Sequence, residues 1–279
     1  MNANYFPKLD PTAITPTRQA LHGYARVLGD CLKRCRSKRK HWWHASLRPS
    51  LDGLSTGVVH SACDFELELS LSESLIRGRT DGGASFSEKL RGQSAAELAA
   101  LVAAFLMGNG IDETLLPRAD SQPEADAAYP DYSAEHAAAM GRVLNSVAAA
   151  MVSLRSGIRE ECSPIQVWPH HFDLSMLWLP GDKVPGEDPQ DEESADKQMN
   201  FGFAFGDESI PEPYFYVTAY PEPEAMSRVA LPAGSTWHTQ SFSGALTSYE
   251  TLVSTTDPMA YLLALWNGLL TVGREHMKT

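Results

Sequence analysis

The sequence has few cysteines, no long hydrophobic run and a shortage of positive charge. Four cysteines in 279 residues are too few for a disulfide scaffold and fit free thiols in a reducing compartment. No window approaches about 18 uninterrupted apolar residues, and residues 1–16 lack the charged start and apolar run of a signal peptide. We therefore expect a soluble, cytoplasmic protein without a membrane partner.

Acidic residues outnumber basic ones by 35 to 23, which gives a formal net charge of −12. A surface with this excess of negative charge repels DNA, RNA and anionic lipid, so we expect no nucleic-acid partner. At this length the chain could form one large domain or two small ones, and either can bury a full core without crosslinks.

The first part of the chain reads as a helix, a group of strands and a second helix. Apolar residues recur at three and four positions from Pro16 to about Arg36, the spacing of one helical face. Short alternating runs broken by turn residues over 41–90 predict an antiparallel meander, and "DFELELSL" gives its sheet one wet face. Ser94 and Glu97 form a capping box that begins the second helix.

The same order recurs after residues 112–132, a stretch without periodicity that we interpret as a connecting loop. Ser133 caps a long helix that ends near Gly157, and Asp257 followed by Pro258 begins a closing helix. Between these helices, strands are predicted at 163–179, 199–206, 214–220 and about 238–253.

The two halves resemble each other in order and in motif. "SFSEKLRGQSAAELAALVAAFLMG" resembles "SYETLVSTTDPMAYLLALWNGLLTVG", and aligning "HWWHASL" with "WPHHFDL" sets His44 opposite His171. We therefore predict an α+β fold of two related α–β(n)–α units, residues 1–111 and 133–279. Their antiparallel sheets would pack about a pseudo-twofold with helices outside, as one integrated domain.

Three blocks in the sequence are similar to the signature blocks of a known family. They are "HWWHASL" with "GLSTG" after it, "CSPIQVWPHHFDLSMLWLPG", and "FGFAFGDESIPEPYFYVTAYPEP". In this order they resemble a mainly bacterial family catalogued as domain of unknown function 5996, over essentially the whole chain. The resemblance implies no activity.

The two histidine segments supply the candidate site. If both are strands, alternation places polar residues of each on one face, and a pseudo-twofold would bring the two faces into one cleft. The candidate acid–base residues are His44, His171 and Asp173, and the candidate ligand-binding residues are Trp42, Ser46, Arg48, Ser175 and Glu222. Among these, Arg48 could hold a carboxylate or phosphate through two hydrogen bonds. The alternative is that these residues tie strand ends to helices and that tryptophan fills the core between the units.

Other motifs are weaker. A metal site is not expected, because His-x-x-His on a strand points its rings to opposite faces, and Cys31 and Cys35 suit a helix face turned to a core. The G-x-S-x-G pattern at 53–57 lies between predicted strands, whereas a nucleophile elbow needs a strand entering a helix. No cofactor is expected.

Two further stretches bear on ligands. The run at 33–40 has six cations in eight residues and could bind phosphate or RNA, or could complement a helix end and the acidic loop at 181–198. In "MNFGFAFG" large and bare residues alternate, so pairing with "PYFYVTAY" would leave room for tyrosine rings or for a ligand.

These patterns favour a protein that binds a small, anionic molecule in a cleft lined by His and Trp between two repeats, with acid–base catalysis left open. The alternative is a non-catalytic interaction protein that forms a homodimer and uses its histidines structurally. A metal-dependent hydrolase is the weaker alternative.

Overall fold

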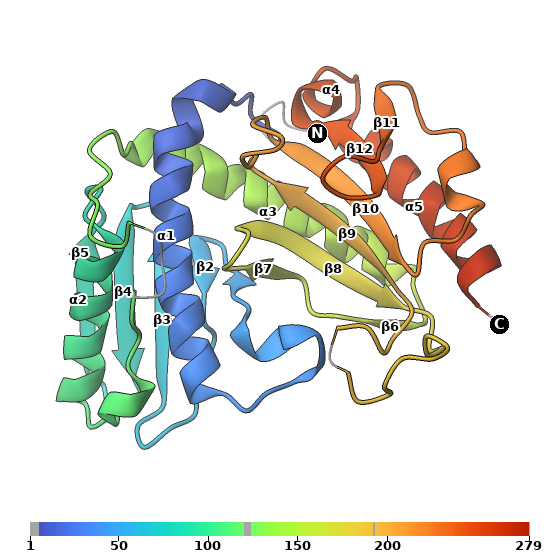
Figure 1. Cartoon of the computed structure of the whole chain (residues 1–279). Helices are drawn as coiled ribbons and strands as arrows, with labels where there is room; N and C mark the ends of the chain where they lie inside the picture. Colours follow the sequence, from blue (N-terminus) through green and yellow to red (C-terminus); the bar gives the residue numbers. More distant parts are fainter. Residues whose placement is uncertain (1–5, 120–123, 192, 279) are drawn as a thin grey trace.

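The computed structural model describes residues 6–119, 124–191 and 193–278. Two antiparallel sheets lie side by side, and helices cover one face of each (Figure 1). The elements in chain order are α1 (Pro11–Cys35), η1 (Lys40–Ala45), β1 (Arg48–Pro49), β2 (Gly53–Ser55), β3 (Phe65–Ser70), β4 (Leu75–Thr80), β5 (Ser85–Lys89), α2 (Ala95–Gly108), η2 (Glu113–Leu115), α3 (Ala134–Ser156), β6 (Glu161–Cys162), β7 (Gln166–Trp168), β8 (Asp173–Leu179), β9 (Gln198–Ala204), β10 (Tyr214–Tyr220), η3 (Met226–Arg228), β11 (Ser235–His238), β12 (Gly244–Ser248), α4 (Tyr249–Val253) and α5 (Pro258–Met277).

The first sheet is a five-stranded meander in the order β1-β2-β3-β4-β5, as the alternation predicts. On β3, Leu67 and Leu69 are fully buried while Glu66 and Glu68 between them are half-buried, so this sheet has one apolar and one wet face. The apolar face is covered by α1 and α2 (Figure 1).

The second sheet has seven strands in the order β11-β12-β10-β9-β8-β6, and β7 also pairs with β8. One of its faces is apolar, since Phe201 and Phe215 pack against Trp266 of α5 with ring centroids 6.4 and 6.2 Å apart. We name the opposite face the tyrosine face. It carries Asp173, Ser175, Asn200, Gly202, Tyr214 and Tyr216.

Most helix starts follow the capping residues found in the sequence. The reciprocal capping box of Ser94 and Glu97 is present, and Ser133 and Asp257 each accept a hydrogen bond from a first-turn N–H. The prediction for the first helix was wrong at its start. α1 begins at Pro11, because the carboxylate of Asp10 caps it.

The segment before β1 is not a strand. Residues 40–45 form the short 3-10 helix η1, in which His41 and Trp42 have left-handed φ angles of 51° and 55°. Such angles are uncommon outside glycine and reverse the local direction of the chain. The assignment of Trp42 and His44 to one strand face was therefore wrong.

The second histidine segment differs in a similar way. The predicted strand 163–179 is divided into β6, β7 and β8, and His171 lies in the turn between β7 and β8. This turn contains Phe172 with a φ angle of 58°, so β8 begins at Asp173 and His171 does not head a strand. The predicted strand 238–253 is likewise divided, because Ser248 caps the short helix α4 with its side chain.

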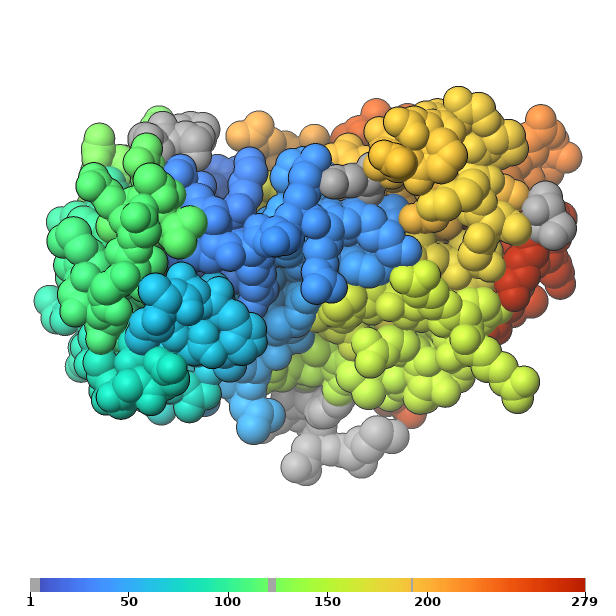
Figure 2. Space-filling model, turned by 90° about the horizontal axis from the view of Figure 1, so that it is seen from below, coloured from blue at the N-terminus to red at the C-terminus, as the bar shows by residue number. Residues whose placement is uncertain are grey.

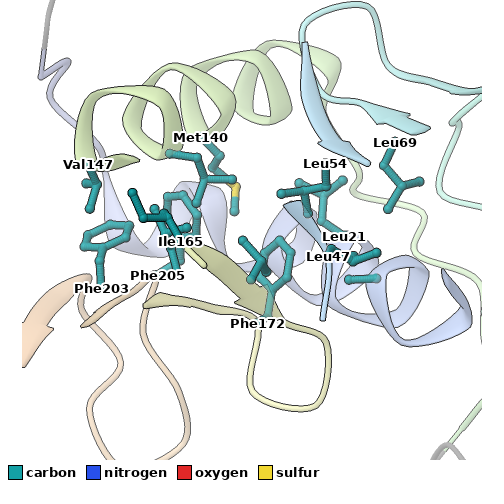
Figure 3. Close-up of a cluster of buried hydrophobic side chains, with 14 of the residues drawn as sticks. Leu21, Leu47, Leu54, Leu69, Met140, Val147, Ile165, Phe172, Phe203 and Phe205 are labelled. Carbon is teal, nitrogen blue, oxygen red and sulfur yellow. The ribbon is translucent and has the colours of Figure 1, made fainter. Parts of the chain in front are cut away.

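The hydrophobic core is continuous across the two sheets. Figure 3 shows Leu47 and Leu54 of the first half beside Phe172 of the second, and Phe203 beside Val147 of α3, all in one cluster of buried side chains. The sheets are joined directly by one antiparallel bridge between Leu47 and Val167.

Helices α1 and α3 each contact both sheets. α1 packs on β3 and donates a hydrogen bond from Arg18 to the carbonyl of Phe205, at 3.4 Å. α3 packs on β1, β2 and β8. By length and composition α3 could cross a membrane, and 56% of its apolar stretch is buried inside the protein.

Candidate functional site

Polar side chains from both halves meet next to the Leu47–Val167 bridge. The fully buried hydroxyl of Ser46 lies 2.7 Å from Oε1 of Gln166, which is also fully buried. Nη1 of Arg48 donates to both groups, at 2.8 and 3.2 Å. Ser46 and Arg48, predicted for one site, are thus brought together by Gln166, which sequence reasoning missed.

Arg48 and Arg36 both lie at β2, because Arg48 is the register partner of Ser55 and Arg36 bonds to the carbonyl of the next residue, Thr56. Burial first, and then the nearby charge of Arg36, lowers the pKa of Arg48 to about 10. Arg36 donates from Nη2 to the carbonyl oxygens of Thr56 and Val58, at 2.7 and 3.1 Å. In the described part of the chain neither guanidinium has a carboxylate within ion-pair distance.

The polar side chains next to the Leu47–Val167 bridge are followed by further polar side chains on β8. Gln166 is the register partner of Ser175, and Trp168 is the register partner of Asp173. The indole Nε1 of Trp168 donates to Oγ of Ser175 at 2.9 Å. A polar seam therefore runs from the end of η1 through β1, β7 and β8 to β10, and we define it as Ser46, Arg48, Gln166, Trp168, Asp173, Ser175 and Tyr216.

Asp173 and Tyr216 form the deepest pair of the seam. The Tyr216 hydroxyl donates to Oδ2 of Asp173 and accepts a 3.5 Å hydrogen bond from Nδ2 of Asn200. Burial raises the pKa of both Asp173 and Tyr216, because the charged form of each group loses its hydration. The sequence placed Tyr216 on a tyrosine stripe, but its contact with Asp173 depends on a register that the sequence does not reveal.

The two candidate histidines have different surroundings. His44 is buried inside η1, where Nδ1 accepts the N–H of Arg39 at 3.2 Å and the ring stacks on Trp42 at 5.4 Å. His171 is exposed, and its ring lies 4.3 Å from that of His170. Its charge lowers the pKa of Asp173 against the larger effect of burial.

Trp42 connects the basic run to the acidic loop 181–198. Its Nε1 donates to Oε1 of Glu193 at 2.6 Å, and the ammonium groups of Lys33 and Lys38 lie 5.5 and 5.0 Å from its ring centroid. Lys40 forms an ion pair with Asp196 of the same loop. Figure 2 shows these segments in contact, blue against yellow. The expectation that the basic run complements this loop is confirmed.

Glu222 is exposed and follows the end of β10 at Tyr220. Asp173 lies level with the other end of that strand, where Ala204 pairs with Tyr214. The structure therefore does not bring Glu222 to the polar seam.

The remaining motifs are structural in the described residues. Gly53–Ser55 forms β2, so the G-x-S-x-G pattern does not lie at a strand-to-helix turn. The cysteines are free thiols, with Cys31 buried and Cys35 half-buried on α1. Among the residues that the structure describes, no group of three or more His, Cys, Asp or Glu side chains could hold a metal ion.

A shallow pocket of about 640 Å³ lies beside the boundary of the two halves. It is formed by the β1–β2 turn, by α3 and by Pro164 and Ile165. Its lining is mainly apolar and includes Leu51 and Val152, whose side chains are 93% and 56% exposed.

A model described as a family of unknown function (DUF5996) matches residues 6–273 of the chain. No curated protein and no solved structure matches it.

Proposed function

Because the chain belongs to the family of unknown function DUF5996, we propose its function from geometry alone: it binds a small anionic molecule at the end of the polar seam that Ser46, Arg48 and Gln166 form. The observation that carries this proposal is the proximity of Arg36 and Arg48, two partly buried guanidinium groups without a carboxylate partner in the described residues.

The charges of these two arginines are not neutralised by a carboxylate within the described residues. Several other arginines pair with acids, as Arg274 does with Glu160 through two hydrogen bonds of 3.0 and 2.8 Å, whereas Arg18 and Arg26 bond to backbone carbonyl groups. With a net charge of −12, the chain has ample carboxylates to neutralise Arg36 and Arg48. Two like charges brought together out of water are costly unless an anion compensates them.

The hydrogen-bonding capacity around Arg48 also favours an anion. A guanidinium has five N–H donors, and in the described residues Arg48 uses only Nη1. Nε2 of Gln166 is a buried donor without an acceptor in the described residues, and Oε1 of the same amide accepts from Arg48. Unused donors on these two neighbouring residues match a ligand rich in acceptors, such as a phosphate or a carboxylate.

Acid–base catalysis by His44, His171 and Asp173 stays a prediction, and the proposal of binding does not depend on it. We further propose that the halves arose by duplication. Each consists of a long helix, an antiparallel sheet and a capped helix, and the Leu47–Val167 bridge joins the two sheets. The strand orders differ, because the first sheet is a meander whereas β10 of the second pairs with β12 and β11 lies at the edge. A comparison of the backbones of residues 1–111 and 133–279 would test this, and unrelated paths would contradict it.

Thermal unfolding with sodium phosphate, against sodium chloride at equal ionic strength, tests the binding proposal. Phosphate should raise the melting temperature, because a ligand at a hundredfold excess over its Kd stabilises the folded state by about 2.7 kcal/mol. Arg48→Met and Arg36→Met should lose this effect. Arg91→Met is the matched control, because Arg91 is exposed and pairs with Glu88. An equal response of wild type and Arg48→Met would overturn the proposal.

One observation favours the interaction protein as a second candidate. Leu51 and Val152 are exposed apolar side chains that share the 640 Å³ pocket, and such patches often mark protein contacts. A second copy of the chain is the partner to test, by sedimentation over a range of concentrations. A dimer that Leu51→Asp dissociates would support this candidate, and a monomer at all concentrations would remove it.

A further inference from the structure

We propose that the tyrosine face holds a second site, beyond the anion site, which takes a ligand bearing an organic ammonium group. The site centres on Asp173, with Asn200 as a second acceptor and Trp168 and Tyr216 as its aromatic neighbours.

Asp173 is a buried carboxyl group whose capacity to accept hydrogen bonds is only partly used by the described residues. Its residue is 6% exposed, and Oδ2 accepts from Tyr216. Oδ1 is fully buried and has no hydrogen-bond partner in the part of the chain that the structure describes. No lysine, arginine or histidine of that part lies within ion-pair distance of it. A buried carboxylate without a counter-ion is costly, so a cationic donor would stabilise it.

Asn200 supplies a second acceptor with a fixed orientation. Its Oδ1 is also buried without a partner, while its Nδ2 donates to the hydroxyl oxygen of Tyr216. That hydroxyl has one hydrogen, which goes to Asp173. Rotating the amide would place oxygen against oxygen, so the free atom must remain an acceptor. Asp173 and Asn200, both joined to one hydroxyl group, thus require donors from outside.

The neighbours of Asp173 are aromatic. Trp168 faces it in register from β7, and the ring of Tyr216 lies over Gly202 in the space where a side chain would otherwise be. Tyr214 adds a ring 6.1 Å from that of Tyr216. Aromatic faces attract cations, and together with a carboxylate they form the usual surroundings of a bound ammonium group.

Charge favours a cation over a neutral hydroxyl compound. The described helices α3 and α5 lie behind the seven-stranded sheet in Figure 1, and on the tyrosine face Phe242 of the β11–β12 loop packs on the rings of Tyr214 and Tyr216, at 6.3 and 6.0 Å, so a ligand would enter beside this ring. The loops that flank this face are acidic, and Asp207 in one of them accepts from the hydroxyl of Tyr214 at 2.6 Å. A hydroxyl group could meet the hydrogen-bond demand, but only an ammonium group also neutralises Asp173.

Three probes of equal length separate these chemistries: n-butylammonium chloride, 1-butanol and sodium butyrate at matched ionic strength. In NMR titrations of the full chain, butylammonium should shift the amide signals of β8 and β9 saturably, while butanol and butyrate should not. Asp173→Asn should weaken butylammonium binding by about tenfold or more, as expected for a lost charge-assisted hydrogen bond. Asp188→Asn, the same change at an exposed loop residue, should leave binding unchanged.

Asn200→Leu provides a second variant in case Asp173→Asn does not fold, and it should weaken binding severalfold. Butanol binding as strongly as butylammonium, or no saturable shift in the wild type, would overturn the proposal. Arg48→Met should leave butylammonium binding intact, so failure of the anion site and failure of this site are distinguishable.

Discussion

Leu47 and Val167 exchange both of their backbone hydrogen bonds, at 3.0 and 2.9 Å, and so connect the edge of the first sheet to the second. Both side chains are buried in the common core. The polar seam is built directly beside this bridge, because the neighbouring residues Ser46 and Gln166 point to the other side and bond to each other.

The shared core predicts cooperative unfolding. Leu47→Ala should lower the free energy of unfolding by about 2–5 kcal/mol, the usual cost of removing a buried leucine side chain. Urea unfolding should remain a single transition in which far-UV circular dichroism and tryptophan fluorescence coincide. Two separated transitions would mean that the halves unfold independently.

Gly202 should not tolerate a side chain. A Cβ atom there would overlap the ring of Tyr216, so Gly202→Ala should cost about 1–3 kcal/mol, as for other overpacked sites. Gly268→Ala is the control, because nothing lies near its Cβ position on α5 and alanine there should stabilise the helix by about 0.5–1 kcal/mol. Equal melting temperatures for the two variants would contradict the packing of Tyr216 on Gly202.

Stability should fall between pH 7 and pH 5. Burial lowers the pKa of His22 from 6.5 to about 4, so the unfolded chain takes up a proton before the folded one. The stabilisation is complete above pH 6.5 and is lost as pH falls toward 4.

We expect a loss of about 1–3 kcal/mol in urea unfolding between these two pH values. His22→Gln should reduce the loss, because glutamine can keep the hydrogen bond to the carbonyl of His170 without titrating. A part should remain, since burial also lowers the pKa of His170 to about 4. A pH dependence identical to that of the wild type would show that His22 does not contribute.

Asp196 should hold the acidic loop against η1. It contacts His41 at 3.1 Å and Lys183 at 2.6 Å. Asp196→Asn should destabilise the protein by about 1 kcal/mol, typical of a partly exposed ion pair, and should speed hydrogen exchange in 181–198. Raising the salt concentration should have a similar but smaller effect in the wild type. Glu187→Gln, in the same loop but exposed and bonded to the Tyr220 hydroxyl at 3.5 Å, is the comparison, and matching exchange rates in both variants would exclude this role of Asp196.

Local signals in the sequence predicted the elements that depend on local chemistry. The capping residues Ser94, Ser133 and Asp257 begin their helices as expected, and β10 has the predicted bounds 214–220. η1 could not be predicted, because the left-handed Trp42 is held by contacts with Glu193, far away in the sequence. The large side chains of residues 40–45 have a pattern that also predicts a strand.

The candidate site was predictable only in part for the same reason. Alternation placed Ser46 with Arg48 and Asp173 with Ser175, since each pair lies on one short segment. Gln166, Asn200 and Tyr216 were missed because their roles follow from strand register, which depends on the whole sheet.

The contacts of α1 and α3 with both sheets have a consequence for dividing the chain. A cut between α2 and α3 would leave α1 in one fragment and α3 in the other. Each fragment would then lack a helix that packs against its buried residues in the intact protein. Neither should persist alone in folded form, but mixed together they should assemble as two unlike subunits.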